Sequence, residues 1–461
     1  MELNKYNNVY FVGAGGIGMA ALVRYFMSLG KKVAGYDRTP TPLTEALIAE
    51  GADIVFHDDV TQIPTAMRNP EDTLVVYTPA VPAENNIMSF FTSGDFTVMK
   101  RAAVLGLITR NSKAICFAGT HGKTTTSTMC AHILQTSGIG CNAFLGGVAR
   151  NYGSNLLLSA TSPWSVIEAD EYDRSFHHLR PYIAVITSTD PDHLDIYGTE
   201  EAYLESFAHF TELIKPGGAL IIHEGLKLQP RVNSQVRTYT YSRESGDFHA
   251  ENIRRSEGSI VFDIVGPGMR VSDITPCEPI DINIDNAIAA AAAAWLTGDV
   301  SPHAVRTAVD TFKGAERRFH FHLKETEGLR RAIIDDYAHH PDELRASIAS
   351  VKALYPQRQL TVAFQPHLYS RTRDFAAQFA EALSLADSVI LLDIYPAREK
   401  PIEGVTSKII FDKITTPKKI LITKNDLVSK IKSCNFDILL TVGAGDINMY
   451  LPQIVKNATE L

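Results

Sequence analysis

The chain has 461 residues, of which 45% are hydrophobic and 21% charged, so it has the composition of a globular protein and the length for several domains. Its net charge of −8 argues against general nucleic-acid binding, which needs a basic surface. No apolar run is long enough for a membrane span, and the N-terminal residues 1–5 do not have the apolar core of a secretory signal. The five cysteines are scattered without metal-ligand spacing, so we expect a protein of the reducing cytoplasm.

The first predicted elements form a βαβ unit. A strand over 9–12 precedes the loop Gly13-Ala14-Gly15-Gly16-Ile17-Gly18, and a helix over 19–29 leads to a second strand over 32–36 that ends at Asp37. Glycines with this spacing at a helix N-terminus bind a diphosphate, and in dinucleotide sites an acidic residue about 20 positions later binds a ribose. The motif therefore predicts a diphosphate, and it fits a dinucleotide and a nucleotide sugar alike.

A second glycine loop follows the next predicted strand. Residues 114–118 lead into Gly119-Thr120-His121-Gly122-Lys123-Thr124-Thr125, and a helix-like segment comes after them. In such a P-loop the backbone N–H groups face a phosphate, the lysine neutralises charge, and the hydroxyl after it binds Mg²⁺. A plain strand-to-helix turn needs neither the lysine nor the threonines, so we predict nucleotide binding here.

Acidic residues follow two further strands. Strands over 164–167 and 183–187 lead into the runs 168–171 (Glu-Ala-Asp-Glu) and 189–193 (Thr-Asp-Pro-Asp-His), and another strand is expected over 219–222. In a sheet built around a P-loop, acids at these strand ends lie beside the phosphates and can hold Mg²⁺. Histidine is an unusual ligand for so hard a cation, and a loop-stabilising role for His193 is the alternative.

The rest of the chain returns to alternating strands and helices. After an antiparallel patch over 236–282 and a packed helix over 287–296 that starts near Asn286, two polar clusters at 335–341 and 365–373 follow strands of one further sheet. The remaining predicted elements of this part are strands over 332–334, 360–364, 388–392 and 438–442 and helices over 341–354 and 374–385.

The whole pattern predicts an α/β protein of three domains. We expect a Rossmann-like N-terminal domain over 1–112, a P-loop central domain with a mainly parallel sheet over 113–314, and a Rossmann-like C-terminal domain over 315–461. Three such modules in a row imply that ligands bind in the clefts between them.

Taken in order, these motifs resemble the Mur ligase family. The matching positions span almost the whole chain: 13–19, 119–125, 168–171, 192–193, Asn283, Asn286, 317–319, 335–341 and 364–367. Within the family the chain looks like the branch that joins L-alanine to UDP-N-acetylmuramate with ATP and Mg²⁺ or Mn²⁺. That resemblance implies phosphorylation of the lactyl carboxylate and attack of the alanine amine on the acyl phosphate. It also implies a cytoplasmic monomer or homodimer without membrane or nucleic-acid partners.

The resemblance assigns roles to individual residues. It implies catalytic roles for Lys123, His193 and His339, and we hypothesise that His339 orients or deprotonates the amine. It implies metal ligation by Thr124, Glu168 and His193. It implies nucleotide binding by Gly119, Thr120, His121, Gly122, Lys123, Thr124, Thr125, Asn283, Asn286, Arg317 and Asp336. It implies binding of the nucleotide sugar and the amino acid by Gly13, Gly15, Gly16, Ile17, Gly18, Asp37, Tyr337, His339, His367 and Arg371.

Several positions depart from the family pattern, among them Tyr172, which is often a serine in other alanine ligases. Leu368 stands where relatives often have an arginine, so we expect Arg371 or Arg373 to contact the alanine carboxylate. Ile282 stands where a histidine commonly precedes the asparagine.

Three alternatives stay open. A recycling ligase that adds a whole tripeptide to the same nucleotide sugar would share most motifs, although the run 188–195 favours the alanine branch. A dinucleotide-dependent oxidoreductase would explain the loop 13–18 and Asp37, but it leaves the P-loop and the C-terminal clusters without a purpose. A non-catalytic nucleotide-sugar sensor would not need Lys123, Glu168 and His193 together.

Overall fold

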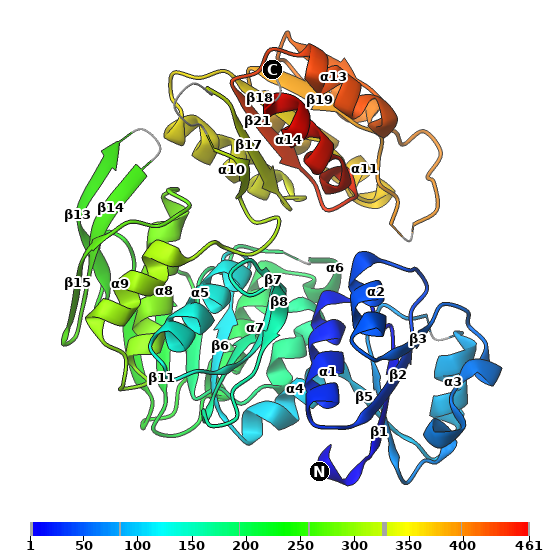
Figure 1. Ribbon diagram of the computed structural model, residues 1–461. Helices are drawn as coiled ribbons and strands as arrows, with labels where there is room; N and C mark the ends of the chain where they lie inside the picture. The colour runs from blue at the N-terminus through cyan, green and yellow to red at the C-terminus, as the bar shows by residue number, and fades with distance from the viewer. Residues whose placement is uncertain are drawn as a thin grey trace. The chain divides into compact units, whose positions relative to one another are not determined.

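The computed structural model describes residues 3–82, 84–192, 194–256, 259–324, 330–397 and 399–459. The chain divides into two compact units (Figure 1). The first contains Met1–Ile253, Val261–Thr275 and Ile284–Lys313, and the second contains Arg254–Ile260, Pro276–Asn283 and Gly314–Leu461.

The first unit begins with a five-stranded parallel sheet in the order β3-β2-β1-β4-β5. The order reverses beside β1, and in sheets of this kind ligands bind at the carboxyl ends of the strands where the order reverses. The strands are β1 (Asn8–Val12), β2 (Lys32–Tyr36), β3 (Asp53–Val55), β4 (Thr73–Tyr77) and β5 (Thr97–Lys100). The helices are η1 (Leu3–Lys5), α1 (Ile17–Ser28), α2 (Pro42–Ala49), η2 (Val60–Gln62), η3 (Thr65–Arg68), α3 (Asn86–Ser93) and α4 (Arg101–Arg110).

A seven-stranded sheet in the order β12-β11-β10-β6-β9-β7-β8 carries the P-loop. Its neighbours are parallel except for the hairpin of β7 and β8. The strands are β6 (Lys113–Ala118), β7 (Asn142–Ala149), β8 (Ser154–Leu157), β9 (Trp164–Glu168), β10 (Ile183–Ile186), β11 (Ala219–His223) and β12 (Arg237–Tyr241). The helices are α5 (Lys123–Thr136), η4 (Tyr172–His178), α6 (Leu194–Tyr197), α7 (Glu200–Glu212), α8 (Ile282–Trp295) and α9 (Pro302–Thr311).

Two predictions for the region after β11 are corrected. Residues 237–241 pair in parallel with β11 as the edge of the P-loop sheet, so the antiparallel prediction is wrong there. It is right for β14 (Ser259–Gly266) and β15 (Met269–Ile274), which lie in a three-stranded sheet with β13 (His249–Ser256). Helix α8 begins at Ile282, before the predicted start near Asn286, and Asp285 lies in its first turn, where the helix dipole favours negative charge.

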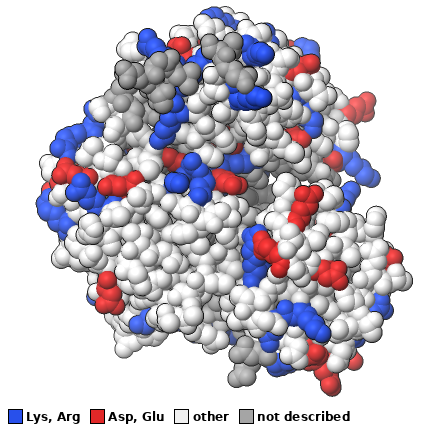
Figure 2. Space-filling model, viewed as in Figure 1, with Lys and Arg blue, Asp and Glu red and all other residues white. Residues whose placement is uncertain are grey.

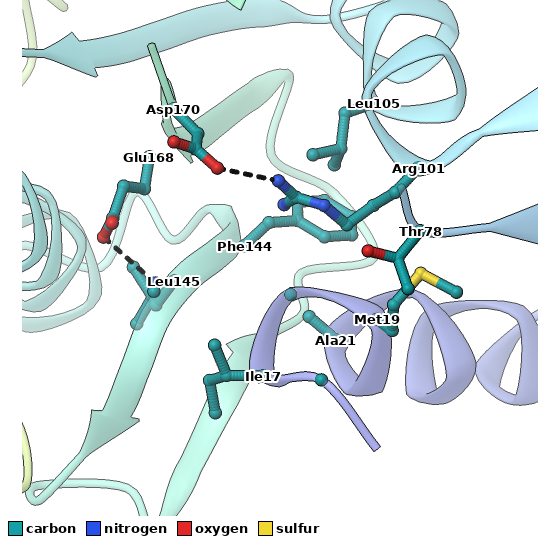
Figure 3. A pocket seen from close by; sticks show the side chains of 13 residues that line it. Ile17, Met19, Ala21, Thr78, Arg101, Leu105, Phe144, Leu145, Glu168 and Asp170 are labelled. Carbon is teal, nitrogen blue, oxygen red and sulfur yellow. Dashed lines mark hydrogen bonds and ion pairs between the residues drawn. The ribbon is translucent and has the colours of Figure 1, made fainter. Parts of the chain in front are cut away.

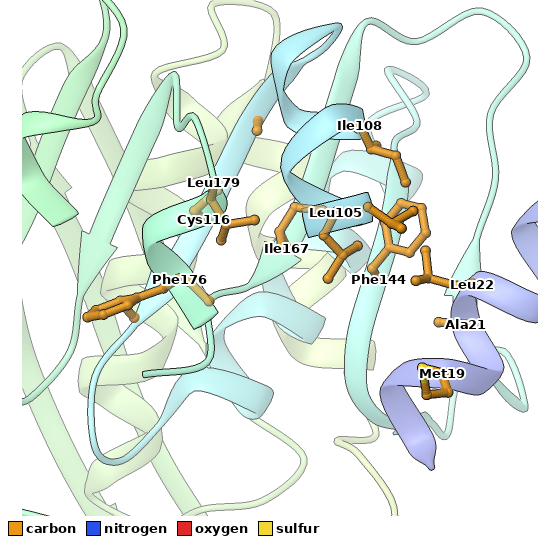
Figure 4. Close-up of a cluster of buried hydrophobic side chains, with 14 of the residues drawn as sticks. Met19, Ala21, Leu22, Leu105, Ile108, Cys116, Phe144, Ile167, Phe176 and Leu179 are labelled. Carbon is orange, nitrogen blue, oxygen red and sulfur yellow. The ribbon is translucent and has the colours of Figure 1, made fainter. Parts of the chain in front are cut away.

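The two sheets of the first unit share one hydrophobic core. Helix α1 packs against the β7–β8 hairpin, where the rings of Tyr25 and Phe144 lie 5.3 Å apart. Asn155 Nδ2 of that hairpin donates to the carbonyl of Ile17 at 2.6 Å. In Figure 4, Leu22 of α1 and Leu105 of α4 lie close to Phe144, and all of them belong to one buried cluster.

The second unit contains a six-stranded sheet in the order β16-β17-β21-β18-β19-β20, parallel except for β16. Helix α11 starts at residue 369 rather than at the predicted 374, so Arg371 and Arg373 lie on a helix and not in a loop. The strands are β16 (His320–Leu323), β17 (Ala332–Asp336), β18 (Leu360–Phe364), β19 (Ser388–Leu391), β20 (Lys419–Leu421) and β21 (Ile438–Val442). The helices are α10 (Pro341–Leu354), α11 (Tyr369–Leu383), α12 (Lys408–Phe411), η5 (Lys424–Asp426), α13 (Leu427–Ser433), η6 (Ile447–Tyr450) and α14 (Leu451–Thr459).

The surface carries charges of both signs. Figure 2 shows Lys and Arg interspersed with Asp and Glu on one face of the molecule, in keeping with the modest net charge of −8. Among the described residues, every helix is too short or too polar to cross a lipid bilayer.

Candidate active site

The P-loop lies between β6 and α5, and two of its glycines have left-handed backbone conformations. The φ angles are 142° at Gly119 and 83° at Gly122. A Cβ on Gly119 would lie 2.2 Å from Thr187 Oγ1, and one on Gly122 would lie 3.0 Å from Asn286 Oδ1. Only glycine fits both positions, and loops of this kind offer the N–H groups at the start of the following helix to a phosphate.

Lys123 is the first residue of α5 and its side chain turns back into the loop. Its Nζ donates to the carbonyl of Gly119 at 2.6 Å and forms an ion pair with Glu171 Oε1 at 2.9 Å. Burial lowers the pKa of Lys123, but nearby carboxylates, Glu171 first among them, outweigh that effect and raise it, so the ammonium stays charged. Glu171 itself is only 2% exposed.

The other predicted nucleotide-binding residues of the loop are fixed by the protein. The hydroxyl of Thr120 donates to the carbonyl of Asp190 at 2.6 Å, and the N–H of His121 donates to Ser188 Oγ at 2.8 Å. Thr124, in the first turn of α5, is 5% exposed. Thr125 follows it in the same turn.

Glu168 ends β9 beside this loop. Its Oε2 accepts a hydrogen bond from the N–H of Gly146 at 3.1 Å. A Cβ on Gly146 would lie 2.2 Å from the same oxygen, so any larger residue in β7 at this point would displace the carboxylate. The acid is thus held at a defined place at the carboxyl end of the sheet.

His193, predicted as a catalytic residue and metal ligand, lies outside the described residues. In the part of the chain that is described, no group of three or more His, Cys, Asp or Glu side chains is arranged to hold a metal ion. The set Thr124, Glu168 and His193 therefore stays a prediction.

The first glycine loop follows β1, and Asp37 lies beside it. The N–H of Gly15 donates to Asp37 Oδ2 at 2.7 Å, and the N–H of Thr39 donates to Oδ1 at 3.2 Å. Both carboxylate oxygens therefore accept bonds from backbone near the loop. Asp37 thus fixes the shape of the loop, and its predicted contact with the ligand stays a prediction.

A cavity of about 240 Å³ connects the first glycine loop with two acids at the carboxyl end of β9 (Figure 3). Gly16, Ile17 and Gly18 line one side, and Glu168 and Asp170 line the other. Figure 3 shows the side chain of Arg101 pointing toward Asp170 across this space. The cavity is completed by Met19, Ala21, Thr78, Leu105, Phe144, Leu145 and Gly146.

Three further predicted nucleotide-binding residues, Asn283, Arg317 and Asp336, belong to the second unit. Arg317 Nε donates to Asp335 Oδ2 at 3.2 Å, and its Nη1 donates to the carbonyl of Gly445 at 3.0 Å. Asp336 ends β17, and burial raises its pKa to about 6. Asn283 Nδ2 donates to the carbonyl of Glu278 at 3.0 Å. In the first unit, Asn286 Oδ1 accepts from the hydroxyl of Thr126 at 3.0 Å, next to the P-loop.

Two histidines meet at the carboxyl edge of the second unit's sheet. The rings of His339 and His367 lie 6.1 Å apart, and the ring of Tyr337 lies 5.3 Å from His339. Burial lowers the pKa of His339, and burial together with His339 and Arg371 lowers that of His367 to about 4. Both rings are therefore neutral at neutral pH. His367 Nδ1 is buried with no hydrogen-bond partner among the described residues.

Leu368 adopts an unusual backbone conformation between His367 and α11. Its φ is 72°, a value that side chains rarely tolerate. The strained turn is held because Leu368 N donates to the carbonyl of Tyr395 at 3.0 Å and the hydroxyl of Thr372 donates to the Leu368 carbonyl at 2.7 Å. Strain of this kind is typical of functional sites.

Sequence reasoning missed Arg101 and Gly146. Arg101 is far from the glycine loop in the sequence, and nothing in the local pattern of α4 sets it apart. Gly146 belongs to a Gly-Gly pair in a strand, and an interior glycine of that kind can signal close approach of another group.

The site combines a P-loop that has a part-buried lysine with an acid at the end of the neighbouring strand, and this acid shares a cavity with a diphosphate-type loop. These features are typical of a nucleotide-dependent enzyme of phosphate chemistry. Three family models cover most of the chain: "Mur ligase family, catalytic domain" at residues 8–113, "Mur ligase middle domain" at 117–294 and "Mur ligase, glutamate ligase domain" at 317–445. The chain belongs to the Mur ligase family. This confirms the expected α/β fold with parallel sheets in N-terminal, central and C-terminal domains, while the boundaries at 112 and 314 stay predictions.

Relatives match over nearly their full length. The UDP-N-acetylmuramate–L-alanine ligase of Parabacteroides distasonis is 58% identical over 97% of this chain and 96% of its own. The enzyme of the same name from Phocaeicola vulgatus is 54% identical over 98% of both. Among solved structures, the UDP-N-acetylmuramate-alanine ligase of Thermotoga maritima matches with a TM-score of 0.81 at 26% identity, covering 98% of this chain and 99% of that one.

Proposed function

We propose that this chain is an ATP-dependent ligase that joins the lactyl carboxylate of UDP-N-acetylmuramate to the amine of L-alanine in peptidoglycan precursor synthesis. The observation that carries the proposal is the cavity with the diphosphate-type loop at one end and Glu168, beside the P-loop, at the other. A nucleotide sugar whose diphosphate lies on the loop can extend through this space toward the acids. Relatives at 58% and 54% identity that are named for this reaction support the assignment.

The donor set fits a hard divalent cation. Thr124 contributes a hydroxyl in the first turn of α5, and Glu168 contributes a carboxylate that Gly146 already orients at 3.1 Å. Oxygen donors of this kind suit Mg²⁺ or Mn²⁺, with His193 as the third proposed ligand. When bound, the cation would neutralise charge on the ATP phosphates.

Lys123 is proposed to offset charge on the transferred phosphate. Its ammonium is bonded to the Gly119 and Thr120 carbonyls at 2.6 and 3.3 Å, and the buried Glu171 keeps it charged. A phosphate in the loop can replace the carbonyls as its partner. Charge stabilisation by a preorganised cation favours transfer to the lactyl carboxylate, which gives an acyl phosphate.

The amine side of the reaction is assigned to His339, His367 and Arg371. His339 Nδ1 lies 3.1 Å from the carbonyl of Tyr337, which can only accept, so Nδ1 carries the proton and Nε2 has a free lone pair. A neutral imidazole is suited to orient or deprotonate the alanine ammonium before it attacks the acyl phosphate.

Arg371 is the better candidate for the alanine carboxylate. Arg373 is exposed and bound to its neighbour Asp374 at 2.7 Å. Arg371 has no ion pair among the described residues, it lies on α11 four residues after His367, and its charge contributes to the lowered pKa of both His339 and His367. We therefore assign the carboxylate contact to Arg371.

The proposal is tested by phosphate release from ATP with Mg²⁺ and UDP-N-acetylmuramate, comparing L-alanine, the L-Ala–D-Glu–diamino acid tripeptide and no amine. Release that depends on L-alanine, with the amide product identified by its mass, is the expected result. Release only with the tripeptide would make the chain a recycling ligase. If neither L-alanine nor the tripeptide causes phosphate release, the ligase proposal is contradicted. NADH binding would then test the oxidoreductase alternative.

The proposal also covers the cellular compartment and the oligomeric state of the protein. We place the reaction in the cytoplasm, where ATP and the nucleotide sugar are made. We expect a monomer or a homodimer, which sedimentation of the purified chain would distinguish.

A further inference from the structure

Arg101 lies over the first glycine loop although it belongs to a different element. It is the first residue of α4, and a Cβ on Gly18 would lie 2.5 Å from its Nη1. The side chain is 20% exposed. Among the described residues that line the cavity, Arg101 is the only cation.

The glycine loop needs a cation from elsewhere. Residues 13–18 contain no lysine or arginine, and Asp37, which binds the N–H of Gly15, carries a negative charge. The N-terminus of a helix supplies only about half an elementary positive charge. The loop alone would therefore leave most of the negative charge of a bound diphosphate without a positive partner.

The guanidinium of Arg101 has N–H donors beyond the one that contacts Asp170. Its Nη2 forms one contact with Asp170 Oδ2 at 3.2 Å, and Asp170 is 40% exposed. The other carboxylate oxygen of Asp170 accepts from the N–H of Tyr172 at 3.1 Å. A guanidinium has five N–H donors, so an anion can bind Arg101 while the contact with Asp170 persists.

We propose that Arg101 binds the diphosphate of the nucleotide sugar. The guanidinium joins the phosphates on the α1 side of the cavity to Asp170, two residues beyond Glu168. This directs the sugar across the cavity and its lactyl carboxylate toward the P-loop. The inference rests on the proposed function, because it takes a nucleotide sugar as the ligand.

The test is the affinity of Arg101→Met for UDP and for UDP-N-acetylmuramate, measured by calorimetry. UDP lacks both the sugar and the lactyl group. Loss of a charge-assisted hydrogen bond to the diphosphate should weaken both ligands by the same factor, about tenfold to a hundredfold. Arg101→Lys should lose less, because it keeps the charge but not the fork of donors. The KM for UDP-N-acetylmuramate should rise while those for ATP and L-alanine stay the same.

Lys100→Met is the matched control. Lys100 is the adjacent cation, but it is bound to Asp173 at 2.9 Å and does not line the cavity. Its loss should change both affinities less than twofold, because an exposed ion pair outside the cavity contributes little. Thermal unfolding of all three variants reports whether any of them is misfolded.

The outcomes separate the two proposals. Wild-type protein that fails to bind UDP-N-acetylmuramate would overturn the proposed function itself. If the wild type binds and turns over but Arg101→Met has unchanged affinities, the role of Arg101 is wrong. If Arg101→Met weakens only UDP-N-acetylmuramate and leaves UDP unchanged, Arg101 contacts the lactyl carboxylate and the diphosphate assignment is overturned.

Discussion

Gly146 determines how the carboxylate of Glu168 is oriented, because glycine has no Cβ to block the approach of β7. The strand β7 passes so close to the carboxylate that its backbone N–H donates to Oε2 at 3.1 Å. A methyl group at Gly146 would lie 2.2 Å from Oε2 and 2.3 Å from Oε1. The orientation of the proposed metal ligand therefore depends on the absence of a Cβ in the neighbouring strand.

We expect Gly146→Ala to displace Glu168 and to lower kcat/KM by roughly tenfold or more, because small displacements of catalytic groups are costly. The Mg²⁺ concentration for half-maximal phosphate release should rise as well. Gly153→Ala is the control in the same hairpin, since a Cβ there meets nothing within 4 Å and adds only backbone strain at φ 62°. Equal Mg²⁺ requirements in the two variants would show that Gly146 does not position the ligand.

Arg371 and Arg373 allow a comparison of two nearby charges on one helix. Arg371→Met should raise the KM for L-alanine about tenfold to a hundredfold, because an ion pair with the substrate carboxylate is lost, while the KM for ATP stays constant. Arg373→Met removes a guanidinium that is already bound to Asp374, and its kinetics should stay close to wild type. Steady-state phosphate release at varied L-alanine measures both. The assignment would be reversed if Arg373→Met showed the larger rise.

At the scale of elements, the far end of α5 is tied to the segment that leads into the second unit. His132 of α5 bonds through Nδ1 to Tyr152 Oη at 2.6 Å and through Nε2 to Thr311 Oγ1 at 3.1 Å. The Thr311 hydroxyl donates to the carbonyl of Thr307 at 2.6 Å, so it must accept from Nε2–H, and Nδ1 accepts from Tyr152. The P-loop helix thus holds a neutral imidazole at the end of α9.

This arrangement predicts a pH dependence of stability. Burial lowers the pKa of His132 to about 4, so the unfolded chain takes up a proton between pH 6.5 and 4 that the folded chain does not. The stabilisation is complete above pH 6.5 and is lost as the pH falls. From pH 7.5 to 5 it amounts to about 2 kcal/mol. The variant His132→Gln has no such titrating group, so only the wild type loses this stabilisation as the pH falls. The difference in free energy of unfolding between the two proteins should therefore shrink by about 2 kcal/mol from pH 7.5 to 5.

The measurement is urea unfolding of both proteins at the two pH values. Asp336, whose pKa burial raises to about 6, changes stability in the opposite sense, but it titrates in both proteins and cancels in the difference. His303→Gln makes the same substitution at an exposed histidine of α9 and is the control for the change of side chain itself. A deficit of His132→Gln that does not vary with pH would mean that His132 is protonated in the folded protein.

Elements with strong local signals were predicted closely, and those set by distant contacts were not. Strands β2, β18 and β21 and helix α10 have the expected bounds; α10 starts at Pro341, with Glu343 accepting from the N–H of His340 at 3.1 Å. The strand 237–241 was predicted to lie in an antiparallel patch but pairs in parallel with β11, because the orientation of pairing is decided by the neighbouring strand and not by local alternation. The early start of α11 follows from the strained turn at Leu368, which no propensity indicates.

At the scale of the whole molecule, the sequence predicted the family and the loops because glycine spacing and strand-end acids are local patterns. The pairing of Asp37 with Gly15 and the approach of Arg101 to Gly18 were not predictable, since both depend on how separate elements pack. The roles of the site residues therefore rest on the experiments above.

The core that runs through both sheets of the first unit limits how this enzyme can be recombined. The family models for the first two modules meet between residues 113 and 117, yet Met19, Leu22 and Leu105 from one side and Phe144 from the other belong to one buried cluster. A fragment that ends at 112 would expose this apolar surface to water. A chimera that exchanges residues 1–112 between relatives must also exchange the matching β7–β8 hairpin, so the first sheet and its glycine loop cannot be transplanted as an independent unit.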